Sequence, residues 1–333
     1  MTTIFSNGMK KIRFCILFFL VALASRAQES SSNFNFLKLP VSAHAAALGG
    51  ANVSLIEDDP TLVFNNPALL ASVSDNTLNL NYSTYLKGSK MASASYVKIL
   101  GDRHTLGLTA QYVDYGSMDE TTESGQNIGT FSAKDIAFSG LYSYSLNERW
   151  VGGATMRLIY SGYADYSSFA IAVDAGLNYF DEDNDFSTSL VLKNVGAQLK
   201  SFHDEKGHLP FDLQLGFTKG ILHAPIRFSV TLIDLTRWNA DYYYHKEGEK
   251  DNFGQILLNH FVFGVDIIPT RQFYLSAGYN VRRARELKAA GSSHGAGWSF
   301  GGGMQLSRLK LGVAYAKYHV AASSLLFNLS YCL

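Results

Sequence analysis

The feature that most constrains the fold of this chain is a period-two alternation of apolar and polar residues, which recurs from residue 77 onward. Between residues 168 and 180, Phe169, Ile171 and Val173 belong to one set and Asp174 and Asn178 to the other. Successive side chains of a β-strand point to opposite faces, so the pattern predicts strands with two unlike faces. We therefore expect an all-β chain.

The alternation occurs in about fourteen runs, most of them 9 to 14 residues long. Strands of soluble sandwiches have about 5 or 6 residues, whereas a tilted strand that crosses a bilayer needs about 9 to 11. The lengths therefore favour a transmembrane β-barrel over a secreted β-sandwich. The runs lie near residues 77–86, 90–99, 104–114, 134–145, 149–161, 167–180, 186–194, 211–219, 226–236, 259–268, 272–282, 296–306, 309–318 and 323–333.

The connections between these runs alternate in length. Every long connection is odd-numbered, although three odd connections are short too. Long loops on one rim and tight turns on the other are typical of outer-membrane barrels, whose termini lie on the short-turn, periplasmic side. Closure also removes unpaired strand edges from lipid. The long connections are residues 115–133, 195–210, 237–258 and 283–295.

Residues 1–27 have the pattern of a secretory signal peptide. Basic residues are followed by an apolar run at 14–24 and by small residues at Ser25 and Ala27, where cleavage is expected. The apolar run is shorter than the roughly 18 residues that a transmembrane helix requires. We therefore expect an exported protein in the outer membrane.

Charge and cysteine content narrow the function classes. Formal net charge is zero, and without the four basic residues of the signal the chain has 24 basic and 28 acidic residues. This balance argues against a nucleic-acid partner, which would require a strongly basic domain. Cys15 lies in the signal, so Cys332 remains alone and no internal disulfide is expected.

Residues 28–75, which we call the hatch, differ from everything that follows. Small residues crowd its first half, and two prolines interrupt its second half. Such a segment is too poor in large apolar groups to form its own core, so we expect it inside the barrel lumen. The residues predicted to matter most for its packing are Gly49, Gly50, Ala51, Asn66 and Pro67.

No catalytic, cofactor-binding or metal-binding residues are predicted. The sequence GSSHG at 291–295 has the spelling of a hydrolase elbow but lacks a flanking strand and helix. Asp181, Asp183 and Asp185 have the initial spacing of a calcium loop without its later glycine and glutamate. The charged cluster at 203–208 is interpreted as a solvated loop rather than as a metal site.

Two groups in the long connections are candidate contact sites. Exposed Tyr and Trp frequently anchor interfaces, which makes the aromatic residues of 237–258 a candidate partner-binding loop; the alternative is an aromatic girdle at the membrane surface. Three arginines are candidate contacts to lipopolysaccharide phosphates; the alternative is ordinary snorkelling at the interface. The two groups are Trp238, Tyr242, Tyr243 and Tyr244, and Arg282, Arg283 and Arg285.

The block LPVSAHAAALGGANVSLIEDDPTLVFNNPALL at 39–70 resembles the N-terminal segment of the FadL-like barrels, with their Gly-Gly-Ala and Asn-Pro-Ala signature. Further blocks are most similar to the PorQ family of the Bacteroidetes type IX secretion system. They include IYSGYADYSSFAIAVDAGLNY at 159–179, LVLKNVGAQLK at 190–200 and FYLSAGYNVRRARELK at 273–288. Together the blocks cover nearly all of the chain after the signal.

The resemblance implies a 14-stranded outer-membrane barrel at 76–333 with the hatch in its lumen. It also implies a non-enzymatic role without cofactors in a surface attachment complex. The implied partners are a PorZ-like surface protein, a PorU-like sortase, a PorV-like barrel, and outer-membrane lipid and lipopolysaccharide. The alternative function is a FadL-like channel for a hydrophobic small molecule, with the hatch as its gate.

Overall fold

A computed structural model describes residues 32–85, 88–202, 207–244, 252–270, 272–291, 295–320 and 322–333. The predicted signal peptide lies outside these residues. None of the helices in the described part of the chain is long and apolar enough to span a membrane.

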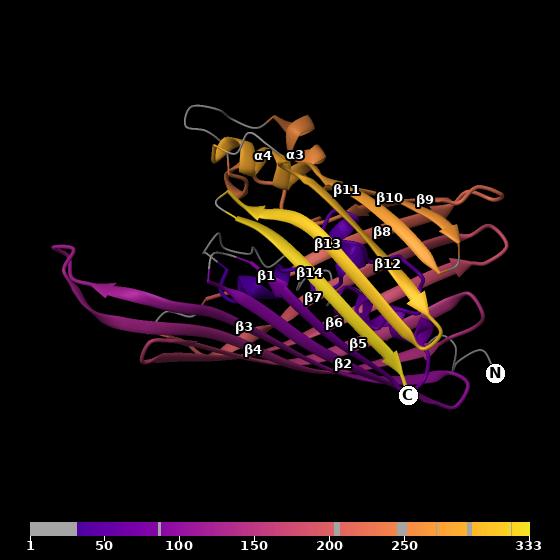
Figure 1. The fold of residues 1–333 in the computed structure, drawn as a ribbon, viewed down its shortest axis with the longest axis horizontal. Coiled ribbons are helices and arrows are strands. Elements are labelled where there is room, and N and C mark those ends of the chain that lie inside the picture. Colours follow the sequence, from indigo (N-terminus) through magenta and orange to yellow (C-terminus); the bar gives the residue numbers. More distant parts are fainter. Residues whose placement is uncertain are drawn as a thin grey trace, which may run out of the picture. The chain divides into compact units, whose positions relative to one another are not determined.

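Fourteen antiparallel strands form one closed barrel, in which each strand pairs with its sequence neighbour and β1 pairs with β14 (Figure 1). The barrel closes by antiparallel pairing of the first strand with the last, in which Asn81 lies opposite Asn328. The predicted fold class is confirmed. The strands are β1 (Thr77–Thr84), β2 (Lys90–Leu100), β3 (His104–Thr121), β4 (Asn127–Ser145), β5 (Trp150–Tyr163), β6 (Tyr166–Asp181), β7 (Phe186–Lys200), β8 (Asp212–Gly220), β9 (Ile226–Leu232), β10 (Phe261–Thr270), β11 (Phe273–Asn280), β12 (Trp298–Leu306), β13 (Leu309–His319) and β14 (Ala322–Cys332).

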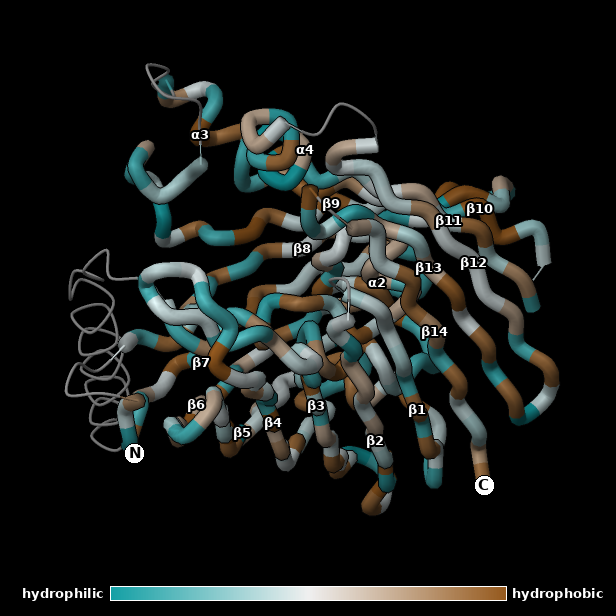
Figure 2. The backbone as a smooth tube through the Cα atoms, turned by 60° about the vertical axis from the view of Figure 1, so that its left-hand side comes forward, coloured by the Kyte–Doolittle hydropathy of each residue, from teal (hydrophilic) through white to brown (hydrophobic). Residues whose placement is uncertain are grey.

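The two faces of the strands have opposite environments. Val173 on β6 is 47% exposed, whereas its neighbour Ala172 is 1% exposed. On β1, Leu80 points out of the barrel and Asn79 is buried inside it. Figure 2 shows the resulting alternation of hydrophobic and hydrophilic segments along the strands. The apolar outer face and polar inner face are those of a barrel embedded in lipid.

The predicted long loop at 115–133 is largely strand, and the one at 195–210 is strand in its first part. β3 and β4 remain paired out to Thr121 and Asn127, and they project as a ribbon well beyond their neighbours (Figure 1). β7 continues to Lys200. The apolar alternation ends where the lipid ends, but backbone pairing does not depend on lipid, so the sequence pattern underestimated these strands.

The other two long connections contain helices. The β9–β10 connection has the short 3₁₀ helix η4 (Ala240–Tyr242) and α3 (Phe253–Asn259). The β11–β12 connection has α4 (Val281–Ala289), whose first turn is capped by the Asn280 side chain accepting from the Arg283 amide. Asn252 and Gln255 form a reciprocal capping box at α3. These capping residues explain why short helices form here.

In its described residues, 32–75, the hatch contains four short helices, and the strands enclose it (Figure 1). The second of them, α2, packs against β11 to β14. Glycines in the wall make this approach possible: a Cβ on Gly278 would lie 2.1 Å from the Gly49 nitrogen, and one on Gly153 would lie 2.4 Å from the Ala68 nitrogen. The helices are η1 (Asn35–Lys38), α2 (Ala43–Ala47), η2 (Leu62–Phe64) and η3 (Pro67–Ser72).

Candidate functional site in the lumen

A buried ion-pair network joins the hatch to the barrel wall on the short-turn side of α2. His44 Nδ1 lies 2.8 Å from Glu57 Oε2, and His44 Nε2 lies 2.9 Å from Asp266 Oδ1. Arg227 contacts the same two carboxylates at 2.5 and 2.8 Å. The imidazole also stacks on Tyr274, with ring centroids 3.8 Å apart. We call the four charged residues the inner lock.

The inner lock is balanced in charge. Burial alone would lower the pKa of His44, but the Glu57 and Asp266 carboxylates outweigh it and raise the pKa to about 10. Burial would raise the pKa of Glu57, but His44 and Arg227 lower it to about 2. At neutral pH the lock therefore holds two cations and two anions, and its burial leaves no net charge without a partner.

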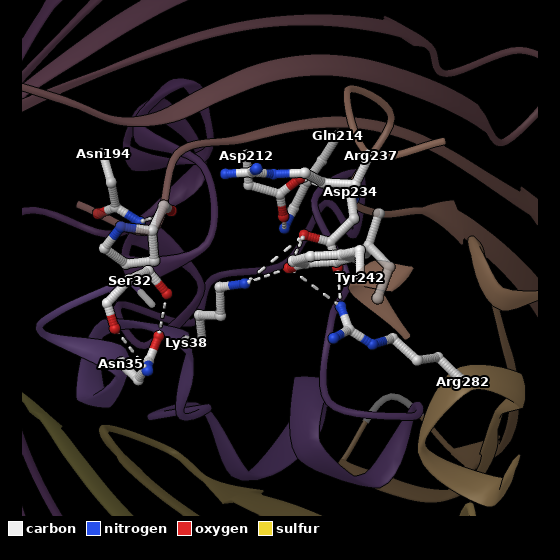
Figure 3. A network of polar contacts seen from close by, with 12 residues as sticks. Ser32, Asn35, Lys38, Asn194, Asp212, Gln214, Asp234, Arg237, Tyr242 and Arg282 are labelled. Atoms are coloured by element: carbon white, nitrogen blue, oxygen red, sulfur yellow. Dashed lines mark hydrogen bonds and ion pairs between the residues drawn. The ribbon is translucent and has the colours of Figure 1, made fainter. Parts of the chain in front are cut away.

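A second polar cluster lies on the long-connection side of the hatch (Figure 3). Lys38 Nζ donates to the Tyr242 hydroxyl at 3.0 Å and lies 3.6 Å from Asp234 Oδ1. Arg282, from α4, approaches Asp234 Oδ2 at 2.5 Å and Glu286 at 2.8 Å. We call Lys38, Asp234, Tyr242 and Arg282 the outer cluster. It joins the start of the hatch to two connections that follow different strands.

A cavity of about 500 Å³ lies beside the outer cluster, and the hatch residues Gly49, Gly50 and Ala51 contribute to its lining. Asn194 and Gln214 contribute from β7 and β8. The charged side chains that line the cavity are five cations, Lys38, Arg157, Lys193, Arg282 and Arg283, and three carboxylates, Asp212, Asp234 and Glu286. Apolar side chains such as Leu37, Val41 and Phe64 also line the cavity, so the lining is mixed, and its charged groups include more cations than carboxylates.

The structure separates the four aromatic residues that were predicted as one surface. Tyr243 is 2% exposed, and Tyr242 belongs to the outer cluster. Trp238 and Tyr244 remain exposed, by 44% and 60%. Tyr242 and Tyr243 therefore face the protein interior, because their hydroxyls find partners there: Asp234 for one and the Arg237 carbonyl for the other.

The three arginines also go to different places. Arg282 is engaged by Asp234 and Glu286, and Arg283 lines the cavity. Arg285 donates to the Gln255 carbonyl and to Asn259 Oδ1. The structure thus places Arg282 and Arg283 on the cavity rather than on an open rim, because α4 turns them toward the lumen. Lipopolysaccharide contact stays a prediction.

The predicted hatch residues lie at close contacts. The Asn66 side chain donates to the Val53 carbonyl at 2.7 Å and accepts from the Ala68 amide at 2.9 Å, so it joins two hatch segments. Pro67 lies directly against Gly153 of β5. A Cβ on Gly49 would come within 2.3 Å of Val262 Cγ1. Gly50 and Ala51 line the cavity.

The inner lock was not predicted. The sequence contains one local signal for it, an ionisable residue on the polar side of a strand run, such as Asp266, because charges inside a barrel need partners. In the described residues no group of three or more His, Cys, Asp or Glu could hold a metal ion. The cluster at 203–208 lies mostly outside the described residues, and His208 forms an isolated backbone bridge with Ser32.

These features define a plugged outer-membrane β-barrel. No protein-family description matches the chain, and no curated protein matches it in sequence. Among solved structures it is similar to a Pseudomonas aeruginosa FadL homologue, with a TM-score of 0.52, 13% identity, and coverage of 88% of this chain and 98% of that one. It is also similar to the Pseudomonas putida toluene transporter TodX, with a TM-score of 0.53, 14% identity and coverage of 88% and 98%.

A third similar structure is the CymD monoaromatic hydrocarbon channel, with a TM-score of 0.55, 12% identity, and coverage of 90% of this chain and 98% of that one. The likeness extends over nearly the whole length of each neighbour, at an identity that bears on the fold alone. The chain has the FadL-type fold: a 14-stranded outer-membrane barrel preceded by an N-terminal segment.

Proposed function

We propose that the protein is an outer-membrane channel for a small molecule and that the hatch is its gate. The observation that carries this proposal is the cavity of about 500 Å³, which lies on the long-connection side of the lumen and is lined by hatch residues. Ligand sites are typically cavities of this size, with a few convergent polar groups. The FadL-type neighbours support the proposal, because two of them are a toluene transporter and a monoaromatic hydrocarbon channel.

In this proposal the hatch closes the route beyond the cavity. The close packing of α2 on β11 to β14 leaves no room for a second occupant at the contact with Gly278 and Gly301. The inner lock then holds α2 to β9 and β10. Passage requires the hatch to move, so the intact protein is expected to conduct ions poorly.

Planar-bilayer recordings and solute uptake into proteoliposomes test the proposal. We expect little steady current from the intact protein, a large current after deletion of residues 36–70, and saturable uptake of a small solute by the intact protein. Steady porin-like current from the intact chain contradicts the hatch as gate. Uptake that never saturates, or that equals empty liposomes, contradicts the channel.

A second candidate function is the anchoring of a surface partner in a type IX secretion attachment complex. The observation that favours it is a group of exposed apolar side chains in the β9–β10 connection. The Trp238 and Phe253 rings stack with centroids 6.1 Å apart. Large aromatic side chains of this kind are common anchors of interfaces. The group is Trp238, Tyr244, Phe253 and Leu258, with exposed fractions of 44%, 60%, 70% and 51%.

This candidate places a PorZ-like protein on the β9–β10 connection, beside PorU-like and PorV-like components. Replacement of Tyr244 and Phe253 by Ala is expected to release the PorZ-like protein into the medium in the native cell. Tyr242 is unsuitable for this test because it belongs to the outer cluster. The control is Phe263→Ala, on the outer face of β10. Retention of the partner by the double variant contradicts the anchor, provided that barrel abundance and heat-modifiable mobility are unchanged.

A further inference from the structure

Arg283 has an unusual environment for an arginine in a protein interior. It lines the cavity, and its Nε is buried without a hydrogen-bond partner among the described residues. Its Nη2 donates to the Gly297 carbonyl at 3.2 Å. Within the described chain, no carboxylate lies at ion-pair distance from it. Its neighbour Arg282, by contrast, pairs with both Asp234 and Glu286.

The described groups in contact with the Arg283 guanidinium are neutral. Its guanidinium lies over the Tyr318 ring, 4.8 Å from the centroid, and a Cβ on Gly50 would lie 3.1 Å from Nη1. The Tyr318 hydroxyl is also buried and has no hydrogen-bond partner among the described residues. Arg283 Nε and the Tyr318 hydroxyl thus lie beside one cavity, and each can still form a hydrogen bond.

A second cation on the cavity wall is similar. Lys193 on β7 donates from Nζ to the Phe64 carbonyl at 3.2 Å, and no described carboxylate lies at ion-pair distance from it. Arg157, in contrast, is satisfied by Asp174 at 2.8 Å and by Asn194 at 2.6 Å. The described carboxylates therefore neutralise the positive charge of the cavity only in part.

An isolated buried cation is costly, and a charge-assisted hydrogen bond that it donates to an oxyanion is a strong way to compensate it. Burial lowers the pKa of Arg283, as expected for a cation without an opposite charge. A neutral hydrocarbon would leave the guanidinium and the phenol unpaired. The cavity chemistry therefore differs from what an apolar ligand needs.

We propose that the cavity binds an oxyanion, the carboxylate or phosphate of a small polar ligand, through the Arg283 guanidinium, with the Tyr318 hydroxyl as a second donor. This inference rests on the proposed channel function and specifies its substrate class. Because Gly50 of the hatch lies against the same guanidinium, an anion at Arg283 also contacts the gate. Ligand binding and hatch position are then coupled.

The full-length barrel in detergent provides the test, by isothermal titration calorimetry with benzoate and with inorganic phosphate. Benzyl alcohol is the neutral probe matched in size to benzoate. We expect saturable binding of at least one anion and none of benzyl alcohol. Arg283→Met is expected to weaken anion binding by about tenfold or more, the range for a hydrogen bond to a charged group. Tyr318→Phe, which keeps the ring, is expected to weaken it less.

The matched control is Arg285→Met, which removes an arginine from the same helix outside the cavity lining. It is expected to bind as the unmodified protein does. If Arg283→Met fails to fold, as judged by heat-modifiable mobility, Arg283→Lys replaces it: the charge remains but the planar fork is lost, and affinity is expected to fall. Equal binding by all variants, or no anion binding, overturns the proposal.

The failure of this site and the failure of the channel are distinguishable. If the protein binds anions but mediates no uptake into proteoliposomes, the channel function is refuted and the oxyanion site is supported. If the protein takes up benzyl alcohol saturably but binds no anion, the oxyanion site is refuted and the channel function is supported. Binding of benzoate but not phosphate assigns the site to carboxylates, and the reverse assigns it to phosphates; both outcomes support an oxyanion site.

Discussion

The two places where the hatch is tied to its surroundings by charge differ in burial and in balance. The inner lock has two cations against two carboxylates, and the side chains of His44 and Asp266 are each 1% exposed. In the outer cluster, Lys38 is 35% exposed, and Asp234 shares its carboxylate among three partners. The inner lock is balanced in charge, and the exposed fractions of its side chains range from 1% for His44 to 23% for Glu57. The outer cluster borders a cavity whose described lining has more cations than carboxylates.

This difference indicates that the two sides of the lumen have different roles. Removal of one partner from a largely buried, balanced network leaves an uncompensated buried charge, so the inner lock should define the position of the hatch. Ion pairs that border water have modest strength, so the outer cluster can change partners at low cost. In the proposed channel, the side that holds the hatch is therefore distinct from the side that would admit a ligand.

The largest effect is expected from breaking the inner lock. Asp266→Asn leaves His44 and Arg227 with one carboxylate fewer, which should weaken hatch closure by about 3 to 5 kcal/mol. The measurement is the urea concentration at which the hatch becomes accessible to protease in the detergent-solubilised barrel. The control is Asp183→Asn, whose side chain is 85% exposed. Equal midpoints for the two variants contradict the lock.

Alkaline pH should open the same lock without mutation. The folded-state pKa of His44, about 10, lies above its ordinary 6.5, so its contribution is full below pH 6.5 and is lost as pH rises through 10. The pKa of Glu57, lowered from 4.5 to about 2, gives a contribution that is present above pH 4.5 and lost toward pH 2. We expect the hatch to be most resistant to protease between pH 4.5 and pH 6.5, where both contributions are full.

The pH test needs a variant that cannot titrate. In His44→Gln the alkaline decline in protease resistance should disappear, while the barrel strands remain protected. If protease resistance declines by the same amount in His44→Gln, the pH dependence belongs to another group, and the inner lock does not differ from the outer cluster in this respect. In the outer cluster, burial would lower the pKa of Lys38, but Asp234 outweighs it and raises the pKa above the ordinary 10.5, so Lys38 loses its charge at higher pH than His44 does.

A smaller effect is expected from the uncharged contact between the hatch and the wall. Gly278→Val places a side chain where a Cβ would lie 2.1 Å from the Gly49 nitrogen, so closure should weaken by about 1 to 3 kcal/mol through overpacking. The same substitution at Gly140, where a Cβ meets nothing within 4 Å, is the control. Protease midpoints in urea give the comparison, and an unchanged midpoint for Gly278→Val refutes the close contact.

The smallest effect is expected at the outer cluster. Lys38→Met removes a partly exposed cation and should change hatch closure by less than about 1 kcal/mol. Conductance of the closed barrel should stay low. A loss as large as that of Asp266→Asn would show that the outer side, and not the inner lock, holds the hatch.

Sequence alone determined the elements whose signal is local. Alternation such as that of Phe169, Ile171 and Val173 marks strands and their lipid faces, because the pleat has a period of two whatever the strand pairs with. It ended where lipid ends, so it missed the outer parts of β3, β4 and β7. Small residues in the hatch predicted close packing without identifying its partners in the wall.

The contacts between side chains inside the lumen could be determined only from the tertiary structure. His44 meets Asp266 across 222 positions of sequence, and Lys38 meets Tyr242 across 204. Such partners follow from barrel closure and strand register, which place side chains of distant strands around one axis. Arg283 Nε has no hydrogen-bond partner among the described residues, and this too can be seen only in the tertiary structure. Local patterns decide which residues face inward, whereas the partners they meet there depend on the closed barrel.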